Sequence, residues 1–136
     1  MKFPDSIHNE EELDTLLATP YPETVEMMKH LDGDIMILGI GGKMGPTLAK
    51  LAVQAFKDAG VKKRIVGVSR FSEKNLPEKL SSWGVEVISC DLLNINEVEK
   101  LPQIQNIIFM AGRKFGSQGS ESLTWMMNTI VPGNIA

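Results

Sequence analysis

A glycine-rich turn between a short apolar run and a helical pattern most constrains how this chain can fold. The apolar run covers residues 35–38, the turn covers residues 39–45, and the helical pattern begins near Pro46. The first N–H groups of such a helix lack backbone partners, and the helix dipole places partial positive charge there. Glycines allow a sharp turn and let a bulky phosphate approach bare backbone. The segment therefore predicts a phosphate-binding corner after a β-strand.

The rest of the chain repeats the order of strand and helix. We expect strands at residues 35–38, 64–69, 85–89 and 106–110, and helices at about 46–59, 76–83, 94–101 and from Ser120 onward. The continuous hydrophobicity of the first strand is typical of a parallel strand covered on both faces. Right-handed crossovers then predict an α/β fold with a doubly wound, Rossmann-like parallel sheet in the order 3-2-1-4.

Residues 1–32 follow another pattern and are predicted to form an N-terminal helical arm. Three consecutive glutamates at positions 10–12 make the first half of the arm acidic. Pro20 and Pro22 separate two short helices. We therefore divide the chain into this arm and a Rossmann-like domain at residues 33–136.

Composition limits the classes of function that remain. The 136 residues carry a net charge of −3, which argues against nucleic acid as the main partner, and the basic run at residues 62–64 is interpreted as a solvated strand edge. No apolar run approaches the roughly 20 residues that span a bilayer, and the first residues lack the apolar core of a signal peptide. A single cysteine, Cys90, suits a reducing compartment, so we expect a cytoplasmic location.

The glycine spacing carries a resemblance to a known family. Gly39-x-x-Gly42-x-x-Gly45, with Gly41 in addition, does not match a standard Gly-x-Gly-x-x-Gly frame. It resembles the extended short-chain dehydrogenase/reductase group, the NAD(P)-dependent epimerase/dehydratase family. The resemblance covers about residues 33–136 and leaves the arm unexplained.

Further landmarks of that family follow in order. Residues 85–92 resemble its third strand, whose terminal aspartate, here Asp91, contacts the adenine. Residues 107–112 resemble the fourth strand and the small residues beside the cofactor, and residues 126–131 resemble a helix with a structural asparagine, here Asn128. The resemblance implies that Asn128 bridges backbone groups of the central strands.

The catalytic motif of the family is missing. Family catalysis rests on a Tyr-x-x-x-Lys pair, whereas the only tyrosine here, Tyr21, lies in the arm with no lysine at that spacing. Because the sequence also ends within its last helical pattern, we expect a truncated enzyme: the cofactor-binding portion of an oxidoreductase, epimerase or dehydratase, without catalytic residues of its own. Its substrate would be a small molecule, either nucleotide-sugar-like or another hydroxyl/keto compound. The alternatives are a non-catalytic NAD(P)-sensing protein and an α/β domain that binds another phosphate ligand. Whether the protein forms a homo-oligomer is left open.

The residues predicted to contact the cofactor lie in the glycine turn and after the second, third and fourth strands. They are Gly39, Gly41, Gly42, Lys43, Met44, Gly45, Ser69, Arg70, Asp91, Leu92, Ala111 and Gly112. Arg70 stands where an NAD-specific protein carries an acid, and its guanidinium can bind a 2′-phosphate. We therefore predict NADP as the cofactor; Glu73, which could reach the ribose, keeps NAD open.

Several of these residues have a second interpretation. Lys43 lies either along a phosphate or in solvent, and Asp91 either contacts adenine or caps a turn. Arg113 and Lys114, which follow the fourth strand, either bind a phosphate or are solvated. The remaining expectations are structural: Met44 packs under the turn, Cys90 is a small buried apolar residue, and Trp83 and Trp125 belong to the core. No spacing predicts a metal site.

Overall fold

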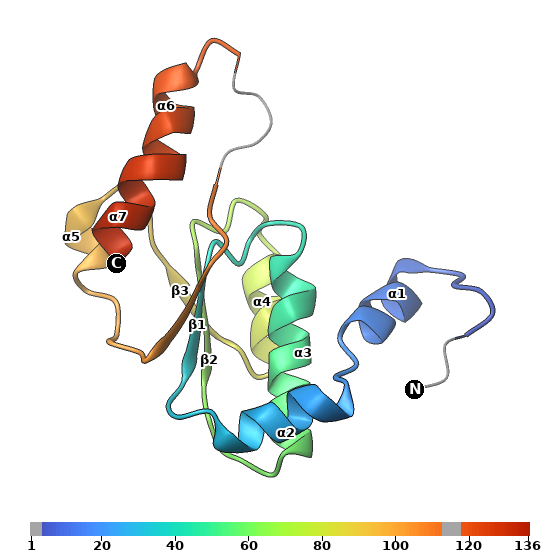
Figure 1. The fold of residues 1–136 in the computed structure, drawn as a ribbon. Coiled ribbons are helices and arrows are strands. Elements are labelled where there is room, and N and C mark those ends of the chain that lie inside the picture. Colours follow the sequence, from blue (N-terminus) through green and yellow to red (C-terminus); the bar gives the residue numbers. More distant parts are fainter. Residues whose placement is uncertain (1–3, 113–117) are drawn as a thin grey trace.

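The computed structural model describes residues 4–112 and 118–136 (Figure 1). Its centre is a sheet of four parallel strands in the order β3-β2-β1-β4. The strands are β1 (Ile35–Leu38), β2 (Ile65–Ser69), β3 (Glu86–Ser89) and β4 (Asn106–Phe109). Leu38 lies opposite Val68 on β2 and Phe109 on β4, so the carboxyl ends of these three strands are level. The predicted α/β fold, parallel sheet and strand order are confirmed.

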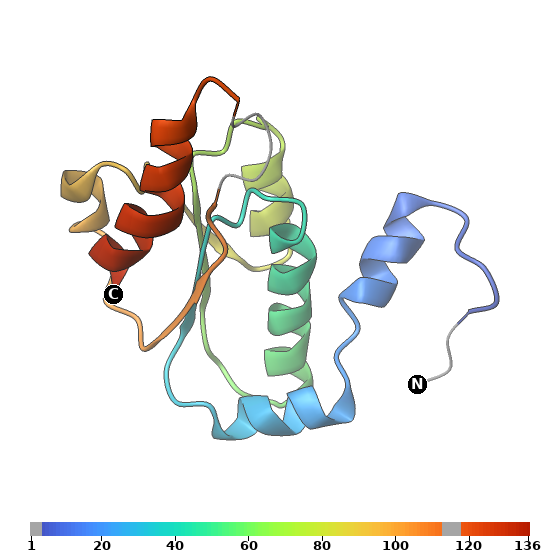
Figure 2. The same cartoon turned by 45° about the horizontal axis from the view of Figure 1, so that its top comes forward.

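Helices cover both faces of this sheet (Figure 2). They are α1 (Glu10–Leu17), α2 (Pro22–His30), α3 (Gly45–Asp58), α4 (Leu76–Ser82), α5 (Ile95–Val98), α6 (Glu121–Trp125), the π-helical segment η1 (Met126–Ile130) and α7 (Val131–Ile135). Figure 2 shows α3 and α4 on one face, and α5 with the continuous helix of α6, η1 and α7 on the other. No helix in the part of the chain that the structure describes has the length and apolar content to cross a bilayer.

Strand β1 supplies both layers of the core because alternate side chains point to opposite faces. Ile35 and Ile37 pack in the cluster that includes Phe56 of α3, whereas Met36 and Leu38 pack in the cluster that includes Val131 of α7. All four β1 side chains are buried, as the continuous apolar run predicted.

The last helix contains a feature that the sequence analysis did not predict. Its middle turn, η1, is π-helical and immediately precedes α7, in which Pro132 occupies the first turn. Proline has no N–H to donate to the carbonyl four residues earlier, and its ring crowds that carbonyl. A wider π turn relieves both conflicts locally, so the helix continues to Ile135.

The N-terminal helices form as expected, with Pro20 between them. Helix α2 buries Met28 against the α3 layer. Helix α1 begins at Asn9, whose side-chain oxygen accepts a hydrogen bond from the Glu12 N–H at 2.8 Å. The C-terminal end of α1 is anchored by Ala18, which is buried.

The two tryptophans do not behave alike. Trp83 packs partly buried against the core, with the ammonium groups of Lys50 and Lys79 each 5.1 Å from its ring. Trp125 is 71% exposed, so the prediction that it belongs to the core is wrong. Its position on the outer side of the last helix explains the error, because Met127 and Val131 supply the side facing the sheet.

Candidate functional site

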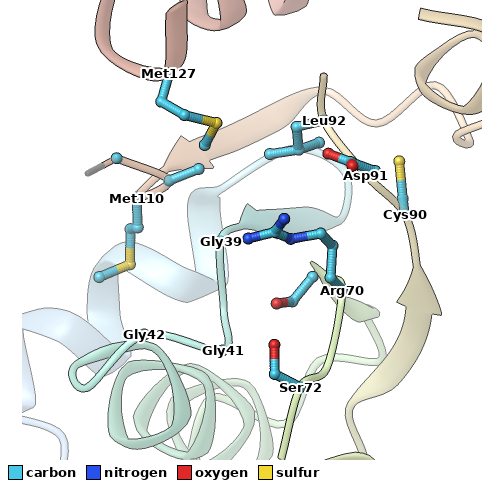
Figure 3. Close-up of a pocket in the computed structure, with 13 residues that line it drawn as sticks. Gly39, Gly41, Gly42, Arg70, Ser72, Cys90, Asp91, Leu92, Met110 and Met127 are labelled. Carbon is cyan, nitrogen blue, oxygen red and sulfur yellow. The ribbon is translucent and has the colours of Figure 1, made fainter. Parts of the chain in front are cut away.

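The carboxyl ends of all four strands open into one pocket of about 250 Å³ (Figure 3). It is lined by Gly39, Gly41, Gly42, Ser69, Arg70, Ser72, Cys90, Asp91, Leu92, Met110, Ala111, Gly112 and Met127. These residues come from the ends of four strands and from the last helix, so only the folded sheet brings them together. The position beside β1, where the strand order reverses, is the usual ligand crevice of an open α/β sheet.

Most of the residues predicted from the sequence line this pocket. From the turn these are Gly39, Gly41 and Gly42; from the other strand ends they are Ser69, Arg70, Asp91, Leu92, Ala111 and Gly112. Lys43, Met44 and Gly45 are not among the lining residues. The predicted phosphate roles of Arg113 and Lys114 lie outside the described residues.

Two glycines hold the turn in shape. Gly39 has a φ of +86°, and a Cβ there would lie 2.5 Å from the backbone nitrogen of Ala111. A Cβ on Gly45 would collide with the carbonyl oxygen of Ile40, which the turn places directly beneath it. Hydrogen bonds from Gly42 N–H to Gly39 O and from Gly45 N–H to Gly42 O, each 3.1 Å, link the successive bends. The turn therefore requires glycine at its first and last positions.

Gly42 differs from Gly39 and Gly45 in its backbone conformation and surroundings. Its φ lies outside the left-handed region, and a Cβ there would meet only Gly39 O at 3.5 Å. Backbone strain therefore gives no reason for glycine at position 42, in contrast to Gly39. Gly42 is exposed and faces the pocket, so a side chain there would occupy ligand space without disturbing the turn.

Met44 lies on the outside of the turn. It is 71% exposed, so the prediction that it packs beneath the turn is wrong. Ile40, which is fully buried, fills that space instead and contacts the α3 layer of the core. The close packing of Gly45 over the Ile40 backbone leaves no room there for a second large side chain.

The end of β2 contributes a cationic group to the pocket. Arg70 is exposed, has no ion-pair partner among the described residues, and extends its guanidinium across the pocket toward Gly39 (Figure 3). The next residue, Phe71, has a φ of +48° and donates its N–H to Ser69 Oγ at 3.4 Å. This bend brings Ser72 into the pocket beside Ser69. An arginine and two hydroxyls then converge on one region.

The end of β3 contributes Cys90, Asp91 and Leu92. Asp91 accepts a hydrogen bond from the Leu93 N–H at 3.1 Å, and its own N–H donates to Glu97 Oε2 at 2.8 Å. The carboxylate thus has the turn role, while adenine contact stays a prediction. Cys90 is buried, as predicted, and burial, followed by the nearby charge of Glu97 and then that of Asp91, raises the pKa of its thiol. A thiol with a raised pKa is a poor nucleophile, which agrees with a packing role.

The end of β4 approaches the last helix. A Cβ added to Gly112 would lie 3.2 Å from Asn128 Oδ1, so Asn128 lies beside the strand-end loop. Its predicted bridging of the central strands stays a prediction. Met127, one residue earlier, lines the pocket from the same helix.

Sequence reasoning missed some lining residues. Ser72 lies close in sequence to the predicted Ser69 and Arg70. Allowing for a bend in the chain after β2 could have predicted that Ser72 also lines the pocket. Cys90 and Met110 lie next to predicted residues but were interpreted as apolar packing or strand. Nothing in the sequence pattern singled out Met127, whose place depends on how the last helix crosses the sheet.

No family model matches the chain, and no curated protein matches it. The class therefore follows from the structure itself. A four-stranded parallel sheet in the order 3-2-1-4, with flanking helices, is consistent with a Rossmann-like domain. Among the described residues, no group of three or more His, Cys, Asp or Glu side chains is placed to hold a metal ion.

Proposed function

We propose that residues 33–136 bind a dinucleotide cofactor, NAD(P), in the pocket at the carboxyl edge of the sheet. The observation that carries the proposal is the convergence of the exposed Gly41–Gly42 backbone, the Arg70 guanidinium and the Asp91 turn on a single pocket. The N-terminus of the 14-residue helix α3 adds partial positive charge at the glycine turn. This arrangement suits a pyrophosphate at the turn with an adenosine toward β2 and β3.

The proposed preference is for NADP. Arg70 has no carboxylate partner among the described residues, so its guanidinium is available for a charge-assisted contact with a 2′-phosphate. Ser69 and Ser72 line the same part of the pocket and can donate hydroxyl hydrogen bonds to the same group. Glu73 does not line the pocket, which weakens the case for NAD.

The proposed role is the cofactor-binding portion of an oxidoreductase, epimerase or dehydratase of the extended short-chain dehydrogenase type. The bound nicotinamide would supply the hydride chemistry, and these residues would bind and orient it. Substrates would be nucleotide-sugar-like or other hydroxyl/keto compounds. The glycine turn and the order of landmarks after it support this class over other phosphate-binding α/β domains.

A dinucleotide-sensing role without catalysis is the second candidate. It is favoured by one observation: among the described residues, none that lines the pocket is a tyrosine or a lysine, and Tyr21 lies in the arm, where it precedes α2. A positioned acid–base group contributes about 10²–10⁴-fold to such reactions. Both candidates predict that residues 1–136 bind cofactor and transfer no hydride. Hydride transfer by the purified chain would contradict both.

Calorimetric titration of the purified chain with NADP⁺, NAD⁺ and inorganic pyrophosphate tests the proposal. We expect a one-site isotherm for NADP⁺, weaker binding of NAD⁺, and the weakest binding of pyrophosphate. Gly42→Val is the site variant, and Gly133→Ala is its matched control, because nothing lies within 4 Å of a Cβ at Gly133. Absence of binding for all three ligands by the wild-type chain would overturn the proposal.

A further inference from the structure

Helix α1 presents an uncovered apolar and acidic face. No residue of α1 is buried, and Leu13 and Leu17 are 40% and 52% exposed. Glu10 lies three and seven positions before these leucines, so the three side chains share one face of the helix. Neither Glu10 nor Glu11 has an ion-pair partner in the described part of the chain.

The remaining sides of α1 contact helices of the same chain. Thr15 and Thr19 line a cavity together with Lys50 and Gln54 of α3, and Asp14 pairs with Lys79 of α4 at 3.3 Å. These contacts hold α1 beside α3 in both views (Figures 1 and 2). The leucine face therefore points away from the chain's own domain.

A groove of matching character lies on the same side of the sheet, at the start of β2. It measures about 410 Å³ and is lined by Val53, Phe56, Lys57, Val61, Lys62, Lys63, Arg64 and Gly84. Its floor is apolar, with Phe56 buried, and the ammonium of Lys63 lies 6.0 Å from the Phe56 ring. The nucleotide pocket shares none of these residues.

The rim of this groove carries uncompensated positive charge. Arg64 is paired with Asp34 at 2.7 Å and with Glu86 at 3.4 Å. Lys57 and Lys62 have no such partner among the described residues. The dipole of α3 accounts for a lysine in its last turn, but not for Lys62 or for the apolar floor.

We propose that this groove binds helix α1 of a second copy of the chain. The leucines of α1 would cover the apolar floor, and Glu10, which shares their face of the helix, would face Lys57 and Lys62. Both complementary surfaces belong to the same chain, so two copies can satisfy each other reciprocally in a closed two-fold dimer. Charge complementarity thus selects a second copy over an unrelated protein, and the inference is independent of what the nucleotide pocket binds.

Sedimentation velocity on the full 136-residue chain tests the proposal with charge reversal. We expect a dimer at low salt that weakens as salt rises, because exposed ion pairs are screened. Glu10→Lys places a positive charge of the arm against the lysines of the groove, and Lys57→Glu with Lys62→Glu places negative charge of the groove against Glu10. Each of these two variants alone should lose at least about tenfold in association.

Mixing the arm variant with the groove variant provides the decisive measurement. The reversed arm of one then meets the reversed groove of the other, and their unchanged arm and groove also match, so a heterodimer should form with near wild-type affinity. Glu78→Lys with Glu99→Lys is the matched control: both residues are exposed and outside both surfaces, and association should not weaken. A monomeric wild-type chain, a dimer indifferent to both reversals, or failure of the mixture to associate would each overturn the proposal.

Discussion

Strands β1 and β4 are neighbours in one sheet and have the same length, yet their side chains are buried to different extents. Each has four residues and at least three apolar side chains, Ile-Met-Ile-Leu in β1 and Asn-Ile-Ile-Phe in β4. All of β1 is buried, whereas Ile107 of β4 is 47% exposed. Among the described strands, β1 is paired on both sides and β4 only on one. Position in the sheet, more than composition, decides how much each strand contributes to stability.

The largest expected effect tests this difference directly. Ile37→Ala removes a fully buried side chain from β1 and should lower the free energy of unfolding by about 2–5 kcal/mol. Ile107→Ala makes the same chemical change in β4 and should cost less than about 1 kcal/mol, because that side chain is half in solvent. Urea unfolding followed by circular dichroism measures both. Equal losses would show that the edge strand is covered in solution.

The next effect compares the two strand ends as ligand sites. Gly42→Val, after β1, should abolish measurable dinucleotide binding, a loss of at least about 100-fold, because the new side chain occupies the space of the pyrophosphate. The urea midpoint should change little, since a Cβ at Gly42 meets only Gly39 O at 3.5 Å. Gly112→Ala, after β4, requires only a small shift of Asn128 and should weaken binding far less. If Gly42→Val binds as tightly as wild type, the phosphate site lies elsewhere.

A third prediction examines whether the adenosine lies toward β2, away from β4. Arg70→Ala should lower NADP affinity by about 10- to 100-fold, equivalent to about 1.5–3 kcal/mol, and leave NAD affinity nearly unchanged. Arg70→Asp should reverse the preference, because a carboxylate repels the 2′-phosphate. Fluorescence titration with NADPH and NADH measures the ratio. Equal affinities in wild type that Arg70→Ala leaves unchanged would contradict the assignment.

The smallest effect concerns the amino ends of the same two strands. Asp34, just before β1, accepts hydrogen bonds from the Arg64 backbone N–H at 2.8 Å and from Arg64 Nε at 2.7 Å. These bonds lower the pKa of Asp34 below its ordinary value of 3.8. At β4 the corresponding hydrogen bonds come from a neutral amide: Asn106 Nδ2 donates to Asp32 O at 2.6 Å and to Asp34 O at 3.0 Å.

Of these two sets of hydrogen bonds, only the one at β1 involves a group that titrates in acid, the carboxylate of Asp34. The contribution of Asp34 is complete above about pH 4, its unfolded pKa, and is lost as pH falls through the lower folded pKa. Because the pair is partly exposed, we expect at most about 1 kcal/mol, visible as a shallower acid decline of stability in Asp34→Asn than in wild type. Asn106→Ala should lower stability without changing the shape of this pH profile. Parallel acid profiles for wild type and Asp34→Asn would contradict the pKa argument.

Much of the fold could be predicted because its signals are local. The apolar run of β1 and the glycines that follow it each act within a few residues of sequence. Strand order also followed, because right-handed crossovers leave few topologies for a chain of alternating strands and helices. Lining residues at four strand ends were predicted for the same reason: parallel strands bring their carboxyl ends to one edge.

What the sequence determined by itself, then, is the series of βα units and the chemistry at their ends. Only the tertiary structure decided which apolar side chains face the core and which face solvent. Ile40 took the space under the turn and left Met44 in solvent, and the crossing of the last helix exposed Trp125 while bringing Met127 to the pocket. Such outcomes depend on contacts between segments far apart in sequence. Neither residue type nor spacing encodes them, because a buried site is filled by whichever side chain the packed backbone brings to it.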